Sequence, residues 1–454
     1  MSRAAGRLDP ARRAAFRALR AVSADGAYAN LALAQAVARE GLTGRDAAFA
    51  TELVSGACRW QGTWDRVIEA AGGRALSTLQ PAVVDVLRLG VHQLLAMRVA
   101  PHAAVALSVE AARVLVGERT TGVVNAIMRR VATDDRDGWL DRLTAGMDAT
   151  DALAIRTAHP RWIMDAFASV LPADELPATL AADNAPASPT LAVRPGLMTR
   201  DALLAASSGE PTPYSPWGVR RTGDPGELVA VRDGLAGVQD EGSQLVCLAA
   251  SRAVEGGSAG PWLDLCAGPG GKAALLRGLA ADHGASLVAG EVQPHRAHLV
   301  AQALRAYPVA GHAVVCADGC AAPWRPATFG LVAADVPCAG LGALRRRPES
   351  RWRRQPSDLA DLVPLQTRLL TSALDATKPG GLVAYITCSP HPGETAGVVL
   401  PAADERGAEI LDAPSFLPEV PDATAATDSR FVQLWPHRHG TDAMFLALLR
   451  VPRA

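Results

Sequence analysis

The chain has 454 residues, which is longer than a usual single domain and predicts more than one domain. Hydrophobic residues make up 49% of it, enough to form buried cores, and the net charge of −1 neither favours nor excludes a nucleic-acid partner. The longest apolar stretches are broken well short of a membrane span, and the opening MSRAAGRLDP lacks an apolar signal segment, so we expect a cytoplasmic protein without a membrane anchor.

The seven cysteines do not have the spacing of a metal site. They lie at positions 58, 247, 266, 316, 320, 338 and 388. Only Cys316 and Cys320 are close together, and no histidine cluster lies near them. We therefore expect free thiols and no bound metal.

Residues 9 to about 131 have the pattern of a helix bundle. Asp9 followed by Pro10 is typical of a helix start, because the carboxylate can cap the first turn and proline loses no hydrogen bond there. Further amphipathic runs are expected from Pro81, over 105–116 and over 123–131. Few strand signals interrupt them, which favours an all-α domain.

The segment that follows is less regular. The charged stretch TDDRDG at 133–138 is typical of a linker. Helical spacing returns from Leu153 to about Leu180, and seven prolines lie between Asp183 and Pro225. These features predict a small mixed connector subdomain.

From Gln239 onward, short apolar runs alternate with helical segments. The strand candidates are WLDLC, SLVAGEV, HAVVCAD, FGLVAADV and GGLVAYITC, which is typical of a parallel sheet with crossover helices. The last two runs, RFVQLWP and MFLALLRV, are separated by only HRHGTDA, too short for a crossover, so they should pair antiparallel. The predicted fold is α/β, a parallel sheet that ends in an antiparallel hairpin.

The stretch WLDLCAGPGGKAALL has the pattern of a strand, a glycine loop and a helix. Gly268, Gly270 and Gly271 would let the backbone approach a ligand beside the amides of a helix N-terminus. A P-loop would need glycine in place of Cys266 and Ser or Thr in place of Ala273, and the dinucleotide fingerprint would need glycine in place of Ala273. The loop alone is equally compatible with an ordinary strand-to-helix turn.

Two acidic residues follow the next two strands. Glu291 could accept hydrogen bonds from ribose hydroxyls, and Asp318 could meet an adenine edge. Either one alone would more simply be a solvated loop residue. Together with the glycine loop they favour a nucleoside-bearing cofactor without a dinucleotide pyrophosphate, and S-adenosylmethionine fits.

Two lone cysteines end two predicted strands, Cys338 in DVPCAGLG and Cys388 in YITCSP. Either could be a small buried hydrophobe. However, open α/β sheets bind ligands outside the carboxyl ends of their strands, so adjacent strands would bring both thiols to one substrate. One thiolate could add to carbon 6 of a pyrimidine and activate carbon 5 toward a methyl sulfonium. The second thiol could assist release, and Asp335 could hydrogen-bond the N3 and N4 edge of cytosine.

These motifs resemble those of a known family. DLCAGPGGK, DVPCAGLG followed by RRRPESRW, YITCSPHPGET and HRHGTDAMF are similar to the motifs of the Nop2/Sun RNA cytosine-5 methyltransferases. YANLAL and RDAAFATELVSGACRWQGTWD resemble the NusB-like domain of its bacterial Sun/Fmu subgroup, which methylates 16S rRNA. The resemblance covers nearly the whole chain. It implies a NusB-like helical RNA-binding domain at 1–135, the connector at 139–235 and a class I, Rossmann-like S-adenosylmethionine-dependent methyltransferase domain at 236–454.

The resemblance also implies a role for each motif residue. Cys388 would be the nucleophile, Cys338 would promote product release, and Asp335 would contact the base. The implied cofactor pocket consists of Cys266, Ala267, Gly268, Pro269, Gly270, Gly271, Lys272, Glu291, Asp318 and Asp335. Gln239 and Asp240 match the motif that precedes the cofactor loop.

Two positions depart from the family pattern. Val336 stands where alanine is commoner, a small change in bulk beside the pocket. Cys320 stands where arginine is often found, which removes a basic contact from that loop. Neither change touches the cysteine pair.

The RNA contacts have two interpretations each. RRRPESRWRR at 345–354 could follow phosphates and stack a base on Trp352, or be a solvated charge run. His439 and Asp442 could contact substrate or form a structural turn. The first helix carries a row of basic residues that could face RNA or simply be exposed, namely Arg12, Arg13, Arg17 and Arg20.

We therefore expect an S-adenosylmethionine-dependent enzyme that methylates carbon 5 of a cytosine in 16S rRNA through a covalent cysteine adduct. The alternatives are a methyltransferase of another RNA, such as tRNA or 23S rRNA, and a non-catalytic RNA-binding assembly factor. Loss of a motif cysteine would favour the last alternative, and both cysteines are present. RNA is the expected partner, and a monomer is the default.

Overall fold

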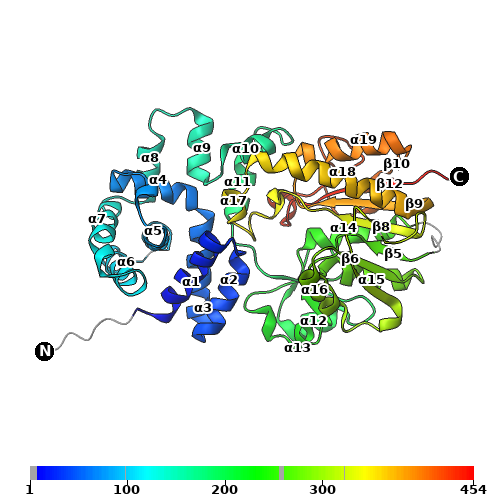
Figure 1. The fold of residues 1–454 in the computed structure, drawn as a ribbon, viewed down its shortest axis with the longest axis horizontal. Helices are drawn as coiled ribbons and strands as arrows, with labels where there is room; N and C mark the ends of the chain where they lie inside the picture. Colours follow the sequence, from blue (N-terminus) through cyan, green and yellow to red (C-terminus); the bar gives the residue numbers. More distant parts are fainter. Residues whose placement is uncertain (1–7, 98, 255–259, 322, 454) are drawn as a thin grey trace. The chain divides into compact units, whose positions relative to one another are not determined.

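The computed structural model describes residues 8–97, 99–254, 260–321 and 323–453 (Figure 1). The chain divides into two compact units, one of Met1–Asp165 with Leu344–Arg354, and one of Ala166–Ala343 with Gln355–Ala454. Across the described residues, no helix combines the length and the apolar content that a membrane crossing requires.

The first unit is helical, as predicted. Its helices are α1 (Pro10–Asp25), α2 (Ala29–Glu40), α3 (Gly44–Arg59), α4 (Gln61–Gly72), α5 (Pro81–Leu95), α6 (Pro101–Leu115), α7 (Thr121–Val131), α8 (Arg136–Thr144), α9 (Ala149–Thr157) and α17 (Ser350–Arg353). The expected start of α1 is confirmed, since the Asp9 side chain accepts a hydrogen bond from the backbone amide of Arg12 at 2.9 Å. The apolar faces of α1, α3, α4, α5 and α7 form one core around Trp64.

The predicted linker at 133–138 is wrong, because a helix begins inside it. The Asp135 side chain accepts a hydrogen bond from the amide of Gly138 at 2.9 Å and caps α8. Trp139 on α8 is buried, and its indole N–H donates to the carbonyl of Val131 at 2.9 Å. The charged residues therefore mark a helix cap rather than an open linker.

The basic residues of α1 form ion pairs within the helical unit. Arg13 and Arg17 both pair with Glu40 on α2. Arg12 pairs with Asp9, the N-cap of its own helix, and Arg20 pairs with the buried Asp85 on α5 at 2.7 Å. These contacts give the row of arginines a structural role, since they hold α1 against α2 and α5.

The arginine-rich segment belongs to the helical unit and is packed there. Arg351 is fully buried, and its guanidinium donates to the carbonyl of Ala158 at 3.0 Å. The indole N–H of Trp352 donates to the carbonyl of Cys58 at 2.8 Å, and a side chain on Gly62 would overlap the Trp352 ring. These two residues are therefore packing residues in this structure.

The second unit contains the predicted sheet. Its strands are β5 (Trp262–Asp264), β6 (Leu287–Glu291), β7 (His312–Cys316), β8 (Phe329–Asp335), β9 (Thr377–Thr387), β10 (Glu409–Ile410), β11 (Val432–Gln433) and β12 (Phe445–Arg450). The order is β10-β12-β9-β8-β5-β6-β7, with β5 to β9 parallel. The antiparallel hairpin is confirmed, because β12 pairs with β11 and also with β9.

Helices cover both faces of this sheet (Figure 1). Helices α14 (Glu241–Arg252), α15 (Gly271–Asp282) and α16 (Pro294–Leu304) lie on one face, and α18 (Leu359–Ala376) and α19 (Ala396–Arg406) on the other. Side chains of β9 alternate between the two cores: Leu382, Ala384 and Ile386 join the first, and Val383 and Tyr385 the second. This two-sided burial explains why β8 and the second half of β9 are continuous apolar runs.

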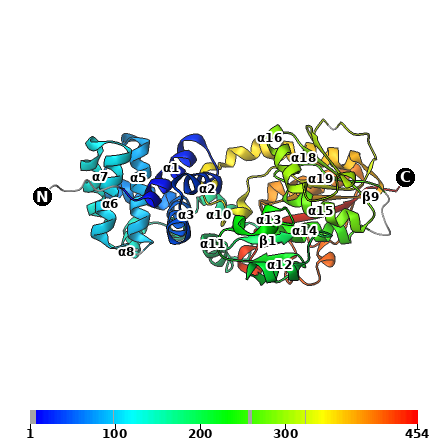
Figure 2. The ribbon, with the colours of Figure 1, turned by 90° about the horizontal axis from the view of Figure 1, so that it is seen from below.

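The connector is a small mixed layer, as expected. Its strands β1 (Thr190–Val193), β2 (Glu210–Pro211), β3 (Gly218–Arg220) and β4 (Ala236–Val238) form a sheet in the order β2-β3-β1-β4. Figure 2 shows α12 (Arg200–Ser207) beside β1. Instead of one helical run before this sheet, the chain forms α9, α10 (Arg161–Ala168) and α11 (Leu176–Asn184).

The packing of Trp352 generates a stability prediction. Trp352→Ala should lower the free energy of unfolding by roughly 2 kcal/mol or more, because it removes a packed ring. Trp352→Phe keeps a ring and should cost about 1 kcal/mol for the lost hydrogen bond. Chemical denaturation of the full chain without RNA measures both, and wild-type stability of Trp352→Ala would contradict the packing role.

Candidate active site

The order of the parallel strands places one switch point beside β5. The chain continues from β5 to β6 and β7 on one side, and to β8 and β9 on the other. Ligands of open α/β sheets bind outside the carboxyl ends of the strands at such a point. Four of the predicted residues come from these ends: Glu291 ends β6, Asp335 ends β8, and Asp318 and Cys388 follow β7 and β9.

The glycine loop runs from the end of β5 to the start of α15. Gly270 precedes α15 with φ of 110°, a backbone conformation that favours glycine, and a Cβ there would lie 2.6 Å from the Cβ of Ala303. A Cβ on Gly268 would overlap the carboxylate of Glu291. The glycines are therefore required by packing as well as by the loop shape.

Glu291 has a structural task that its predicted role did not include. It is buried, and its two oxygens accept hydrogen bonds from the backbone amides of Gly268 and Gln293, both at 3.0 Å. Each carboxylate oxygen has a further lone pair for a ligand hydroxyl. Asp318 is exposed, and its Oδ1 accepts from the amide of Cys320 at 2.9 Å.

A buried amide lies against the glycine loop. Gln239 is 5% exposed, and neither its Oε1 nor its Nε2 has a hydrogen-bond partner among the residues that the structure describes. A Cβ on Gly271 would lie 3.9 Å from the Gln239 Cδ. Burying an unsatisfied amide is costly, so this donor and acceptor fit a polar ligand held by the loop.

The HRHGTD turn is held by structural contacts, which involve Asp240, His439 and the backbone of Asp442. One Asp240 oxygen accepts hydrogen bonds from the amides of Gly242 and Asp442, each at 2.9 Å, which caps α14 and holds the loop before β12. His439 bonds to the amide of Trp435 at 2.8 Å and to the carbonyl of Pro421 at 2.9 Å. These contacts favour the structural interpretation of the HRHGTD turn.

Lys272 and Asp335 form an ion pair beside the loop. The Lys272 Nζ lies 2.9 Å from Asp335 Oδ2 and 3.2 Å from Ser243 Oγ. Burial by itself lowers the pKa of Lys272. The charge of Asp335 and smaller contributions, which include Cys388, raise it, and their sum exceeds the effect of burial. The pKa of Lys272 is therefore raised overall. Lys272 therefore stays cationic beside the thiols.

The two cysteines meet, as the sequence analysis expected from adjacent strands. Strands β8 and β9 pair in parallel, and the Sγ atoms of Cys338 and Cys388 are 3.4 Å apart. The hydrogen bond with Cys388 and then burial raise the pKa of Cys338 well above its usual value. Cys338 thus keeps its proton at neutral pH and can donate it toward the Cys388 sulfur.

Asp264 is a residue that the sequence analysis did not select. It lies on β5 at the start of the DLCAGPGGK motif, fully buried, and neither oxygen has a hydrogen bond of normal geometry within the described residues. Burial, followed by the charge of Asp335, raises its pKa to about 7. An acidic residue inside an apolar strand just before the glycine loop was the available signal.

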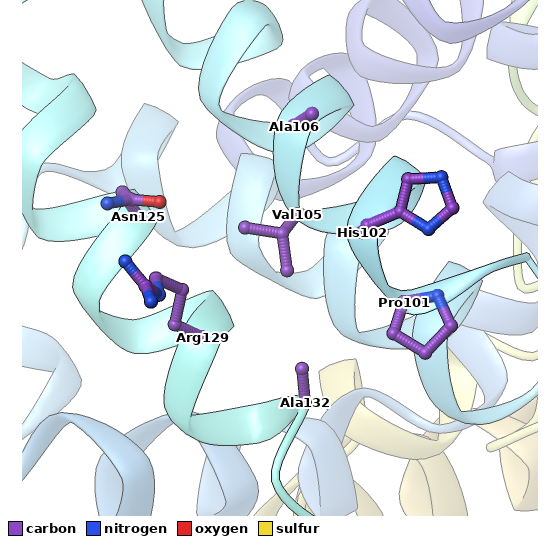
Figure 3. A pocket seen from close by; sticks show the side chains of 7 residues that line it. All are labelled: Pro101, His102, Val105, Ala106, Asn125, Arg129 and Ala132. Carbon is purple, nitrogen blue, oxygen red and sulfur yellow. The ribbon is translucent and has the colours of Figure 1, made fainter.

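The helical unit has a surface hollow of its own (Figure 3). It has a volume of about 420 Å³ and is lined by residues of α6, α7 and the turn after α7, namely Pro101, His102, Val105, Ala106, Asn125, Arg129 and Ala132. None of the predicted site residues lines it. Among the described residues, no group of three or more His, Cys, Asp or Glu is placed to hold a metal ion.

Comparisons with known proteins show the family to which the chain belongs. The family model described as "16S rRNA methyltransferase RsmB/F" matches residues 254–450, and the NusB family model matches residues 9–133. A putative methyltransferase of Mycobacterium tuberculosis is 50% identical over 98% of this chain and 97% of its own. The ribosomal RNA small subunit methyltransferase B of Pseudomonas putida is 32% identical over 88% of this chain and 91% of its own. The crystal structure of PH0851 superposes with a TM-score of 0.82 at 19% identity, covering 99% of both chains.

The fold and the site define a class I, S-adenosylmethionine-dependent methyltransferase joined to a NusB-like helical domain. Within that class, the chain belongs to the RsmB/F family of 16S rRNA methyltransferases. It is therefore an RNA methyltransferase, and the resemblance to the Nop2/Sun family drawn from its motifs is confirmed.

The raised pKa of Asp264 generates a prediction on pH. Between its ordinary pKa of 3.8 and about 7, the unfolded state binds fewer protons at this carboxyl than the folded state. The stability of the folded state should therefore fall as pH rises through this window. Asp264→Asn should remove this loss, so that the variant gains stability relative to the wild type between about pH 5 and about pH 8.

Chemical denaturation at the two pH values measures the difference. Asp282→Asn, at the exposed end of α15, is the matched control and should behave like the wild type. An equal pH dependence in Asp264→Asn and the wild type would refute the assignment.

Proposed function

We propose that this enzyme transfers the methyl group of S-adenosylmethionine to carbon 5 of a cytosine in 16S rRNA, through a covalent adduct with Cys388. The observation that carries the proposal is the 3.4 Å contact between Cys388 and Cys338 at the ends of two adjacent parallel strands. A single thiol could be a packing residue. Two thiols in contact at the ligand-binding edge of a methyltransferase sheet match a reaction that needs both a nucleophile and a group for release.

Cys388 acts as the nucleophile. Its sulfur forms a bond to carbon 6, and the electrons of the C5–C6 double bond move to carbon 5. Carbon 5 then takes the methyl group, and the electron pair of the broken S–CH3 bond stays on the sulfur of the departing S-adenosylhomocysteine. Loss of the C5 proton to a base then restores the double bond as the S–C6 bond breaks and Cys388 leaves as a thiolate. The protonated Cys338 and the cationic Lys272 both stabilise negative charge on the Cys388 sulfur, which favours attack and departure.

Cys338 and Asp335 complete the catalytic set. Cys338 lies in contact with the sulfur that must leave and assists its release. Asp335 is held by Lys272 at the end of β8. It accepts a hydrogen bond from the N4 amino group of the cytosine, and also from N3 once N3 carries a proton. The pairing with Lys272 fixes the orientation of the carboxylate before the base arrives.

The cofactor is held by the loop after β5 and its neighbours. Gln239 offers its unpaired amide, Glu291 offers the remaining lone pairs of its oxygens to the ribose, and Asp318 meets the adenine edge. The loop residues Cys266, Ala267, Gly268, Pro269, Gly270, Gly271 and Lys272 line the same pocket. When bound, S-adenosylmethionine supplies an electrophilic methyl group on a sulfonium.

The choice of 16S rRNA rests on the family model, which is described as a 16S rRNA methyltransferase, and on relatives such as the Pseudomonas putida protein, which is named as a small-subunit rRNA methyltransferase. In this proposal residues 1–135 hold the RNA, 139–235 connect, and 236–454 carry out the chemistry. The enzyme acts as a cytoplasmic monomer and needs no metal.

Variants of the two cysteines test the mechanism. Cys338→Ala should trap a covalent protein–RNA complex, because release is impaired, whereas Cys388→Ala should form none and transfer no methyl group. Each variant is incubated with 16S rRNA and S-adenosylmethionine and analysed on a denaturing gel, with methylation read by bisulfite sequencing. Cys316→Ala, which changes an exposed cysteine at the end of β7, is the control.

The results separate the roles. Methylation by both variants, or a trapped complex that persists without Cys388, would overturn the assignment. Methylation of tRNA or 23S rRNA but not of 16S rRNA would overturn the substrate alone.

The orphaned amide generates a prediction on cofactor binding. Gln239→Ala should weaken the binding of S-adenosylhomocysteine by about tenfold, the loss expected for a hydrogen bond to a buried polar group. Isothermal titration calorimetry without RNA measures this, with the exposed Gln355→Ala as control. Unchanged affinity would remove Gln239 from the pocket.

A further inference from the structure

A buried carboxylate reaches from the segment after Cys388 to the loop that holds Cys338. Glu394 ends a 3-10 turn, Pro392–Glu394, and is fully buried. Its Oε1 accepts a hydrogen bond from the backbone amide of Ala339 at 2.8 Å. The residue that follows Cys338 is thus fixed by a side chain six positions beyond Cys388.

A second buried side chain fixes the other side of Cys338. The Nε2 of Gln366, on α18, donates to the carbonyl of Pro337 at 2.8 Å and to Glu394 Oε1 at 2.9 Å. Gln366 is fully buried as well. The Gln366 amide therefore uses both N–H groups, one for Pro337 and one for the Glu394 carboxylate. Because that carboxylate also holds Ala339, the residues on both sides of Cys338 are linked.

Backbone contacts complete the link between the two cysteine segments. The amide of Gly342 donates to the carbonyl of Cys388 at 2.8 Å, and the amide of Val336 donates to the carbonyl of Ile386 at 3.0 Å. The hydroxyl of Tyr385 donates to the carbonyl of Glu394 at 2.8 Å. The loop of Cys338 is thus held on both sides against the turn of Cys388.

We propose that Glu394 and Gln366 form a clamp that positions Cys338 against Cys388 and keeps Cys338 protonated, so that Glu394 is a positioning residue for release of the methylated RNA. The inference rests on the proposed function for the release step. The hydrogen bonds of the clamp and the carboxylate beside Cys338 do not depend on the proposed function.

The electrostatic surroundings of Cys338 support the clamp. The groups that interact with it are Cys388, Glu394 and Asp335, and Tyr385 lies close as a buried neutral phenol. Asp335 is paired with Lys272, and His391 interacts with Glu394. After the hydrogen bond with Cys388 and burial, the negative charges of Cys388, Glu394 and Asp335 add to the rise in the pKa of Cys338. Removing the charge of Glu394 should lower that pKa, so that the thiolate forms at lower pH.

The first experiment measures Cys338 alone, without RNA. In a Cys388→Ala background, the pH dependence of iodoacetamide alkylation at Cys338 is followed by peptide mass spectrometry of the full chain. Glu394→Gln should speed alkylation roughly tenfold at a fixed pH below the midpoint, the effect of about one pKa unit. An unchanged profile would overturn the electrostatic part of the clamp.

Glu241→Gln is the matched control. Glu241 is also buried, and its Oε1 accepts two backbone hydrogen bonds, from Tyr214 and Ser215, both at 2.7 Å. It does not contact either cysteine segment in the described structure. A shift of equal size in this variant would mean that general loosening, rather than the charge beside Cys338, changes the alkylation.

The second experiment measures release, with Cys388 restored. Glu394→Gln and Gln366→Met, which removes both donors but keeps the carboxylate, should each raise the fraction of 16S rRNA in the covalent complex several-fold over the wild type. If the fraction of 16S rRNA in the covalent complex equals the wild-type fraction in both variants, the positioning role is overturned. If Glu394→Gln fails to fold, the result of Gln366→Met alone tests the positioning role. Absence of the complex even in Cys338→Ala would overturn the covalent mechanism instead, and the alkylation profile would still test the clamp.

Discussion

The parallel pairing of β8 with β9 is the constraint on which the site depends. Because the two strands run in the same direction and are adjacent, the loops that follow them leave the sheet at the same edge, and the Sγ atoms of Cys338 and Cys388 come within 3.4 Å. The same pairing brings Asp335 to that edge. A crossover through α18 makes the parallel arrangement possible and supplies Gln366 to the loop of Cys338.

Buried charge is concentrated around this edge, and each group modifies its neighbours. Asp264 lies beneath the loop with a pKa raised to about 7 by burial, while Lys272 stays cationic beside Asp335. The hydrogen bond with Cys388 and then burial raise the pKa of Cys338, and the charges of Glu394 and Asp335 add to this rise. The ammonium of Lys272 instead supports negative charge at Cys388. The two thiols thus have different surroundings, and the nucleophile and the releasing group of the proposed mechanism would need such a difference.

The chain does not separate the two units cleanly. After the loop of Cys338 it contributes Leu344–Arg354 to the helical unit and returns to the second unit at Gln355. The buried Arg351 and the hydrogen-bonded Trp352 hold this segment in the helical unit. The residues that follow the Cys338 motif therefore also stabilise the domain that we propose to hold RNA.

The sequence by itself determined the features that depend on local spacing: the start of α1 at Asp9 and Pro10, the apolar strands, the glycine loop and the identity of the cysteine motifs. Tertiary structure decided the features that depend on contacts between distant residues. A charge run gives no sign that Arg351 will be buried, and Asp264 and Glu394 acquire their properties from burial and from partners far along the chain. Burial and long-range hydrogen bonding are not encoded in any short stretch, because they arise only when the sheet and its helices pack together.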